Sequence, residues 1–235
     1  MTLHTDRQYE SELRELRERL LFMAGKVEEM IAGTTRALVE RDTIRAQRMI
    51  DTDREINRLE VDTDDLCLRI LARRQPAASD LRFITLALKI VTDLERIGDE
   101  CVNIAERAVG LNQEPQLKPL IDLPRMAGIA QEMVRGALDA FVAGDAEKAI
   151  AICKRDDEVD ALNVQVFREL LTYMIEDPRT ISRATMLIGV AKHFERIADH
   201  ATNISEMVVF MVRGKDIRHL SSRVEAETPL GGDPR

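Results

Sequence analysis

The sequence predicts an all-α protein made of two tandem three-helix bundles that are related by internal duplication. Its composition favours helices, with 3% aromatic residues and no Trp among 235 residues. Only 11 Gly and 7 Pro interrupt the chain, so the helices should be long. One motif also occurs twice, because residues 92–106 and residues 192–206 share seven of fifteen residues.

Apolar residues that recur every three or four positions predict six helices. Chain breakers separate them: Pro76 follows the second, Gly144 the fourth, and Gly214 the sixth. The two connections at residues 40–42 and 143–145 are so short that the helices they join should be antiparallel neighbours. The expected helices span residues 8–39, 43–73, 79–110, 117–142, 145–175 and 178–212.

A second match upstream of the motif divides the chain into two units. There the offset is 103 residues, so that residues 42–46 fall on residues 145–149. We therefore expect a first bundle over residues 1–112 and a second over residues 113–214. Apolar periodicity stops after Gly214, and we expect residues 215–235 to form a flexible tail.

Composition also excludes several classes of function. The net charge of -8 argues against nucleic-acid binding, which needs a concentrated positive surface. No apolar run approaches the roughly 20 residues of a membrane-spanning helix, so we expect no membrane insertion. Three scattered cysteines cannot form a disulfide framework, which is typical of a protein in the reducing cytoplasm.

Oxygen-bearing side chains recur about every four residues on two helices of each unit. On the third and sixth predicted helices they lie opposite the apolar face, and both stripes open with Glu. The second and fifth helices carry stripes of their own. The candidate residues are Glu95, Asp99 and Asn103 on the third helix, Glu195, Asp199 and Asn203 on the sixth, Asp53, Asn57 and Glu60 on the second, and Asp156 and Asp160 on the fifth.

An acidic stripe on one helix is most often a solvated face. Here the pattern occurs in both units although like charges four residues apart destabilise a helix by roughly 0.2–0.5 kcal/mol. A bound cation would relieve this repulsion, and oxygen donors suit hard ions such as Mg²⁺, Ca²⁺, Mn²⁺ or iron. Arg residues of a neighbouring helix or a partner could do the same. His200 could add a nitrogen ligand for iron, zinc or nickel.

The runs over residues 70–82 and 88–105, and their degenerate copy over residues 194–204, resemble the PhoU family of phosphate-uptake regulators. The resemblance covers residues 8–214 and implies tandem three-helix bundles. In some members, Glu/Asp-x-x-x-Asp motifs bind multinuclear clusters of iron or zinc, and other members lack metal. Asn57 stands where that motif would place an acidic residue, which implies weaker metal binding in the first unit. The matching ligand positions are Asp53, Glu95, Asp99, Asp156, Asp160, Glu195 and Asp199.

The resemblance also implies a function. Members are expected to be cytoplasmic negative regulators of high-affinity phosphate uptake and of the phosphate-starvation two-component response. The implied assembly is a homodimer. Its implied partners are the ATPase subunit of the phosphate ABC transporter and the phosphate-sensing histidine kinase.

Two other functions compete with this one. A structural spacer built from helical bundles would bind no metal. A di-iron oxidase would need Glu-x-x-His motifs with ligands inside the bundle, and the sequence contains no such motif. Neither a nucleotide-binding glycine loop nor a nucleophile–base arrangement is evident, so we expect that the protein is not an enzyme.

Overall fold

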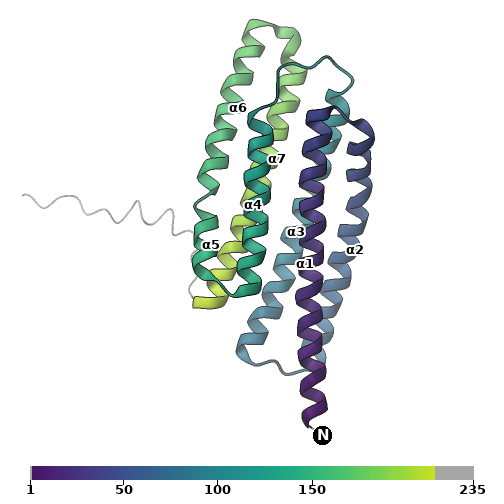
Figure 1. Ribbon diagram of the computed structural model, residues 1–235, viewed down its shortest axis with the longest axis vertical. Helices are drawn as coiled ribbons and strands as arrows, with labels where there is room; N and C mark the ends of the chain where they lie inside the picture. The colour runs from purple at the N-terminus through teal and green to yellow at the C-terminus, as the bar shows by residue number, and fades with distance from the viewer. Residues whose placement is uncertain (1, 215–235) are drawn as a thin grey trace, which may run out of the picture.

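The structure, a computed structural model, describes residues 2–214 and is all-helical over them (Figure 1). The predicted fold class is confirmed, and the tail expected over residues 215–235 lies outside the described residues. The first unit contains α1 (Thr2–Glu40), α2 (Thr43–Arg73) and α3 (Ala78–Leu111). The second contains α4 (Asp122–Ala143), α5 (Ala146–Cys153), α6 (Asp156–Glu176), the short 3-10 helix η1 (Pro178–Thr180) and α7 (Ile181–Arg213).

The two tight turns use the same capping chemistry. Asp42 accepts a hydrogen bond from the backbone N–H of Arg45 at 2.9 Å, and Asp145 accepts one from Lys148 at 2.9 Å. These caps satisfy amide groups that a helix start leaves unpaired. Gly144 closes α4 with a φ of 64°, a left-handed conformation that glycine adopts without strain.

The fourth helix begins at Asp122 rather than at residue 117. Pro124 explains the difference, because proline lacks an N–H and clashes with the carbonyl four residues earlier. A helix starting at residue 117 would place Pro124 in its interior, whereas a start at Asp122 keeps it in the first turn.

The fifth predicted helix, over residues 145–175, is two helices in the structure. A turn at Lys154 and Arg155 separates α5 from α6, and the backbone N–H of Arg155 bonds to the carbonyl of Ile152 at 2.9 Å. The next residues, 156–158, are all acidic, which favours a helix N-terminus at that point. The sixth predicted helix likewise divides, because Pro178 opens η1 before α7 begins.

One hydrophobic core extends through both units. Helix α3 packs against α7, and α1 packs against α4. The rings of Phe83 on α3 and Phe141 on α4 stack with centroids 5.1 Å apart and an interplanar angle of 11°. Such offset contacts between aromatic rings add to the stability that burial supplies. The two bundles therefore pack against each other through a shared core.

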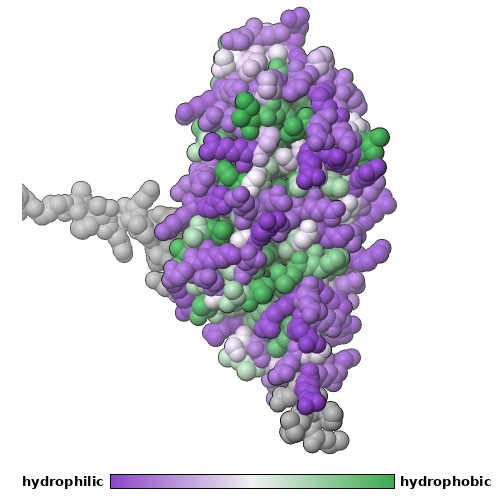
Figure 2. Space-filling view, in the orientation of Figure 1, coloured by the Kyte–Doolittle hydropathy of each residue, from purple (hydrophilic) through white to green (hydrophobic). Residues whose placement is uncertain are grey.

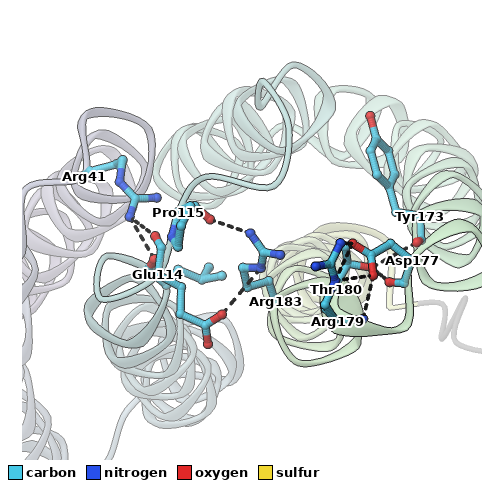
Figure 3. Close-up of polar contacts among 9 residues, drawn as sticks. Arg41, Glu114, Pro115, Tyr173, Asp177, Arg179, Thr180 and Arg183 are labelled. Atoms are coloured by element: carbon cyan, nitrogen blue, oxygen red, sulfur yellow. Dashed lines mark hydrogen bonds and ion pairs between the residues drawn. The ribbon is translucent and has the colours of Figure 1, made fainter.

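Arginines from both units hold the segment between α3 and α4 (Figure 3). Arg41, after α1, donates a hydrogen bond to the carbonyl of Leu111 at 3.0 Å and another to the carbonyl of Glu114. From α7, Arg183 donates to the carbonyl of Pro115 at 2.9 Å and lies 3.5 Å from the Glu114 carboxylate. The first part of the linker is thereby held by side chains from both units.

The surface shown in Figure 2 is mostly hydrophilic and is interrupted by apolar patches, the broadest of which lies across the lower half of the view. Over the described residues, no helix has the combination of length and apolarity that crossing a bilayer requires.

Candidate metal centre

In the second unit, the stripes of α6 and α7 face each other. The pKa of Asp156 is raised to about 7, first by burial and then by the negative charges of Asp199, Asp160 and Glu195. Burial and Glu195 also raise the pKa of Asp160 and of Asp199. Carboxylates shift one another in this way only when they lie close together in a poorly solvated site. The four predicted side chains therefore form one cluster, which we call the second-unit acidic cluster.

The first unit has a corresponding first-unit acidic cluster on α2 and α3. Burial and the neighbouring charge of Asp99 raise the pKa of Asp53, and Asn57 donates a hydrogen bond to Asp53 at 3.0 Å. Gly98 lies where α2 and α3 approach closely, since a Cβ at that position would lie 3.3 Å from Ile56 Cγ2. Glu60 and Glu95 also have raised pKa values through burial and carboxylate neighbours.

Several carboxylate oxygens in these clusters are buried without a hydrogen-bond donor. They are Oδ1 of Asp156 and Oε2 of Glu195 in the second unit, and Oδ1 of Asp53 and of Asp64 in the first. An unpaired buried polar atom costs roughly 1–3 kcal/mol of stability. A cation or a positively charged partner group would satisfy these oxygens.

Two positive side chains partly neutralise the clusters, and sequence analysis had not included them. Lys192 forms an ion pair with Glu195, three residues further along α7. In the first unit, Arg96 lowers the pKa of Glu60 and of Glu95 and so opposes the effect of burial. The i, i+3 spacing of Lys192 and Glu195 is the sequence signal that could have identified the first pair.

Two predicted ligands, His200 and Asn203, lie toward the boundary between the units instead. His200 Nδ1 is 2.8 Å from Asp93 Oδ1 on α3. Asn203 lines a groove of about 490 Å³ together with Asp93 and Asp64. Because four residues exceed one helical turn, each step along a stripe advances about 40° around the helix, so Asn103 and Asn203 have rotated away from Glu95 and Glu195.

The donor set of both clusters fits a hard divalent cation, because it consists of carboxylate oxygens, some of them buried and unpaired. In the conformation of the described residues, no three Asp, Glu, His or Cys side chains are close enough to hold one ion. Ligation would therefore require rotation of these side chains.

The fold and the two acidic clusters define a duplicated helical-bundle protein with acidic faces. A model of the PhoU domain matches residues 20–108 and residues 123–208, so the chain belongs to the PhoU family. This is a family of accessory and regulatory proteins rather than enzymes, and its members act in the regulation of phosphate transport.

Named relatives agree with this assignment. The chain is 45% identical to a phosphate-specific transport system accessory protein PhoU homolog of Pseudomonas putida, over 97% of this chain and 90% of the relative. Identity to the PhoU accessory protein of Escherichia coli is 35%, over 92% of this chain and 90% of that protein.

Solved structures show the same fold. The crystal structure of PhoU from Pseudomonas aeruginosa superposes with a TM-score of 0.85 at 44% identity, covering 88% of this chain and 100% of that one. PhoU from Streptococcus pneumoniae gives a TM-score of 0.83 at 30% identity, covering 88% and 98%.

Proposed function

We propose that this protein is a cytoplasmic docking subunit that lowers high-affinity phosphate uptake and the phosphate-starvation response. The observation that supports docking most directly is the pair of acidic clusters, whose buried carboxylate oxygens lack hydrogen-bond donors. The names of the relatives, accessory proteins of a phosphate-specific transport system, support the setting.

The proposed partners are the ATPase subunit of the phosphate ABC transporter and the phosphate-sensing histidine kinase. Each acidic cluster would accept Arg side chains of a partner, because guanidinium groups bind carboxylates through two parallel hydrogen bonds. The protein would act as a homodimer, which would present each cluster twice. Sedimentation equilibrium on the purified full chain tests the dimer directly.

We further propose that the clusters bind divalent metal, with iron and zinc as the leading candidates. Asp156, Asp160, Glu195 and Asp199 would hold it in the second unit, and Asp53, Glu60, Glu95 and Asp99 in the first. The metal would supply positive charge that neutralises the carboxylates. Equilibrium dialysis followed by elemental analysis tests this part, and purified protein free of iron, zinc, manganese and magnesium would remove it without affecting the docking role.

Deletion of the gene tests the regulatory role. We expect phosphate uptake to rise and phosphate-regulated transcription to remain on when phosphate is abundant. If both are unchanged, the regulatory role is wrong, and a structural spacer becomes the better description.

Complementation of that deletion tests the acidic clusters. The triple variant Asp156→Asn, Glu195→Gln, Asp199→Asn should fold but restore less repression than the unaltered gene. The control variant Glu10→Gln, Glu176→Gln removes charge from two exposed residues outside the clusters and should restore repression fully. Equal repression by the two variants would show that docking uses another surface.

A further inference from the structure

A groove of about 550 Å³ runs along α1 and is bordered by α2 and α4. In Figure 1, α1 lies between these two helices. Gly25, Ala32 and Gly33 of α1 form its small-residue floor. At Gly33 the approach of α2 is so close that a Cβ would lie 2.2 Å from the Met49 sulfur. The groove lies outside both acidic clusters, and its residues have no part in the function proposed above.

Four arginines line this groove in a protein whose net charge is -8. Two of them are neutralised, because Arg135 pairs with Glu28, and Arg45 pairs with Glu40 and Asp42. The other two are Arg36 on α1 and Arg48 on α2. Both are exposed, and within the described residues neither has a hydrogen bond or an ion pair from its side chain.

Each acidic residue that lines the groove lies within ion-pair distance of a cation other than Arg36 and Arg48. Glu28 is engaged by Arg135, and Glu29 lies 3.9 Å from Lys26. Lys26 is itself shared with Glu55, at 3.2 Å. Among the described residues, Arg36 and Arg48 are therefore the two guanidinium groups of the groove that have no direct ion-pair partner.

The second unit provides an internal comparison at the same place in the fold. Gly136 approaches Ile152 as Gly33 approaches Met49, at the offset of 103 residues, so the two sites are structurally equivalent. There, Asp139 occupies the position of Arg36 and forms an ion pair of 2.9 Å with Lys148, which occupies the position of Arg45.

This comparison shows that the fold accommodates a neutral ion pair where the first unit has two like charges. The position of Arg48 is Ala151 in the second unit, so a third positive charge is added there as well. Arg45 turns to Glu40 and Asp42 instead. The fold therefore does not require arginine at positions 36 and 48, and their unpaired guanidinium groups are available to a ligand.

We propose that this groove binds a small phosphate-bearing anion through Arg36 and Arg48, with Arg45 at its edge. Planar guanidinium groups donate paired hydrogen bonds to phosphate oxygens, and two of them from different helices suit a multiply charged oxyanion. The floor of Gly and Ala leaves room for the anion beside the backbone of α1. Free phosphate, pyrophosphate and the phosphate chain of a nucleotide share this chemistry.

The test is isothermal titration calorimetry of the full chain with orthophosphate, pyrophosphate and ATP, at low ionic strength and with EDTA present. The chelator prevents a metal on the acidic clusters from holding the anion. At least one anion should bind, and the order of their affinities identifies the source of the phosphate group. The variant Arg36→Gln, Arg48→Gln should weaken binding by about tenfold for each guanidinium lost.

Two further variants separate a site from general electrostatics and from misfolding. The control double variant Arg69→Gln, Arg168→Gln removes the same charge from exposed residues outside the groove. Its affinity for the anion should be within about twofold of that of the unaltered protein. Arg36→Asp installs the ion pair of the second unit, so it should abolish binding without lowering the thermal midpoint. The proposal is overturned if no anion binds the unaltered protein, or if the two double variants weaken binding equally.

Discussion

His193 of α7 hydrogen-bonds to Glu100 of α3, and His200 of α7 hydrogen-bonds to Asp93 of α3. The internal duplication relates the two pairs. Residues 93 and 193 are duplicated positions, as are residues 100 and 200. Each unit thus contributes to both pairs, one supplying the acids and the other the histidines. The hydrogen bond from His193 and the nearby positive charges of His193 and Arg196 lower the pKa of Glu100, although burial alone would raise it.

We predict that these pairs couple the stability of the two units. Asp93→Asn and His200→Gln should each lower the free energy of unfolding by about 1–2 kcal/mol, because each leaves a poorly solvated group without its partner. A double-mutant cycle in urea should give a coupling energy of about 1 kcal/mol. The unfolding curve should keep a single transition, whereas two transitions would mean that the units unfold separately.

Asp156 should make the protein less stable as the pH rises. Folding raises the pKa of this carboxyl from 3.8 to about 7, so between these values the folded state binds the proton more tightly than the unfolded chain. The free energy of unfolding should therefore fall as pH rises through this window. Urea titrations in EDTA at pH 4.5 and pH 8 measure the effect.

Asp156→Asn should raise the free energy of unfolding at pH 8 by about 1–2 kcal/mol and flatten the pH dependence. The control Glu10→Gln, at an exposed position, should stay within about 0.5 kcal/mol of the unaltered protein at both pH values. A variant Asp156→Asn with an unchanged pH slope would show that this carboxyl is well solvated.

Metal should bind more tightly to the second unit than to the first. Each cluster has four carboxylates, but in the first unit the Asn57 amide already occupies an oxygen of Asp53, whereas the equivalent position in the second unit is the carboxylate Asp160. Two double variants test this order after dialysis against Mn²⁺. The variant with both Asp156→Asn and Asp199→Asn should lose more bound metal than the variant with both Asp53→Asn and Asp99→Asn. Elemental analysis provides the measurement, and equal losses would contradict the predicted order.

Lys192 provides a complementary test of the same cluster. Its ion pair with Glu195 competes with any cation, so Lys192→Ala should increase Mn²⁺ affinity by about tenfold. The equivalent position in the first unit is Thr92, which carries no charge to remove. Weaker metal binding by Lys192→Ala would mean that the lysine positions Glu195 for the ion.

Two glycines of α4 should respond oppositely to Ala. A Cβ at Gly128 meets nothing within 4 Å, so Gly128→Ala should stabilise the protein by about 0.5–1 kcal/mol through helix propensity. A Cβ at Gly136 would lie 2.4 Å from Ile152 Cδ1, and Gly136→Ala should destabilise by about 1–3 kcal/mol. Thermal unfolding compares them, and a stabilising Gly136→Ala would mean that Ile152 moves aside freely.

Local signals in the sequence were sufficient for the helices and for the acidic residues of each cluster. Periodicity predicts which face of a helix is apolar, and the duplicated motif predicts that Glu95 and Glu195 occupy equivalent places. Helix boundaries were less certain where one residue decides them, as Pro124 does for the start of α4. The division of the fifth helix depends on acidic residues at 156–158, whose preference for a helix N-terminus competes with the periodic pattern.

The relation between the units could not be read from periodicity, because it depends on how two finished bundles pack. The helical pattern predicts His200 beside the acidic stripe, and the structure pairs it with Asp93 across the junction. A signal was nevertheless present: where one unit has an acid at positions 93 and 100, the other has His at 193 and 200. Complementary residues at duplicated positions, acids in one copy and histidines in the other, indicate that the copies contact each other there.

The two copies of the duplicated unit share a single core, built by α1, α3, α4 and α7. Neither copy needs to be self-sufficient, since each completes the other's interior. The outward surfaces are then free to diverge, as Arg36 and Asp139 have done at the same place in the fold. Removal of either half would therefore expose to water the apolar surface that the other half now covers.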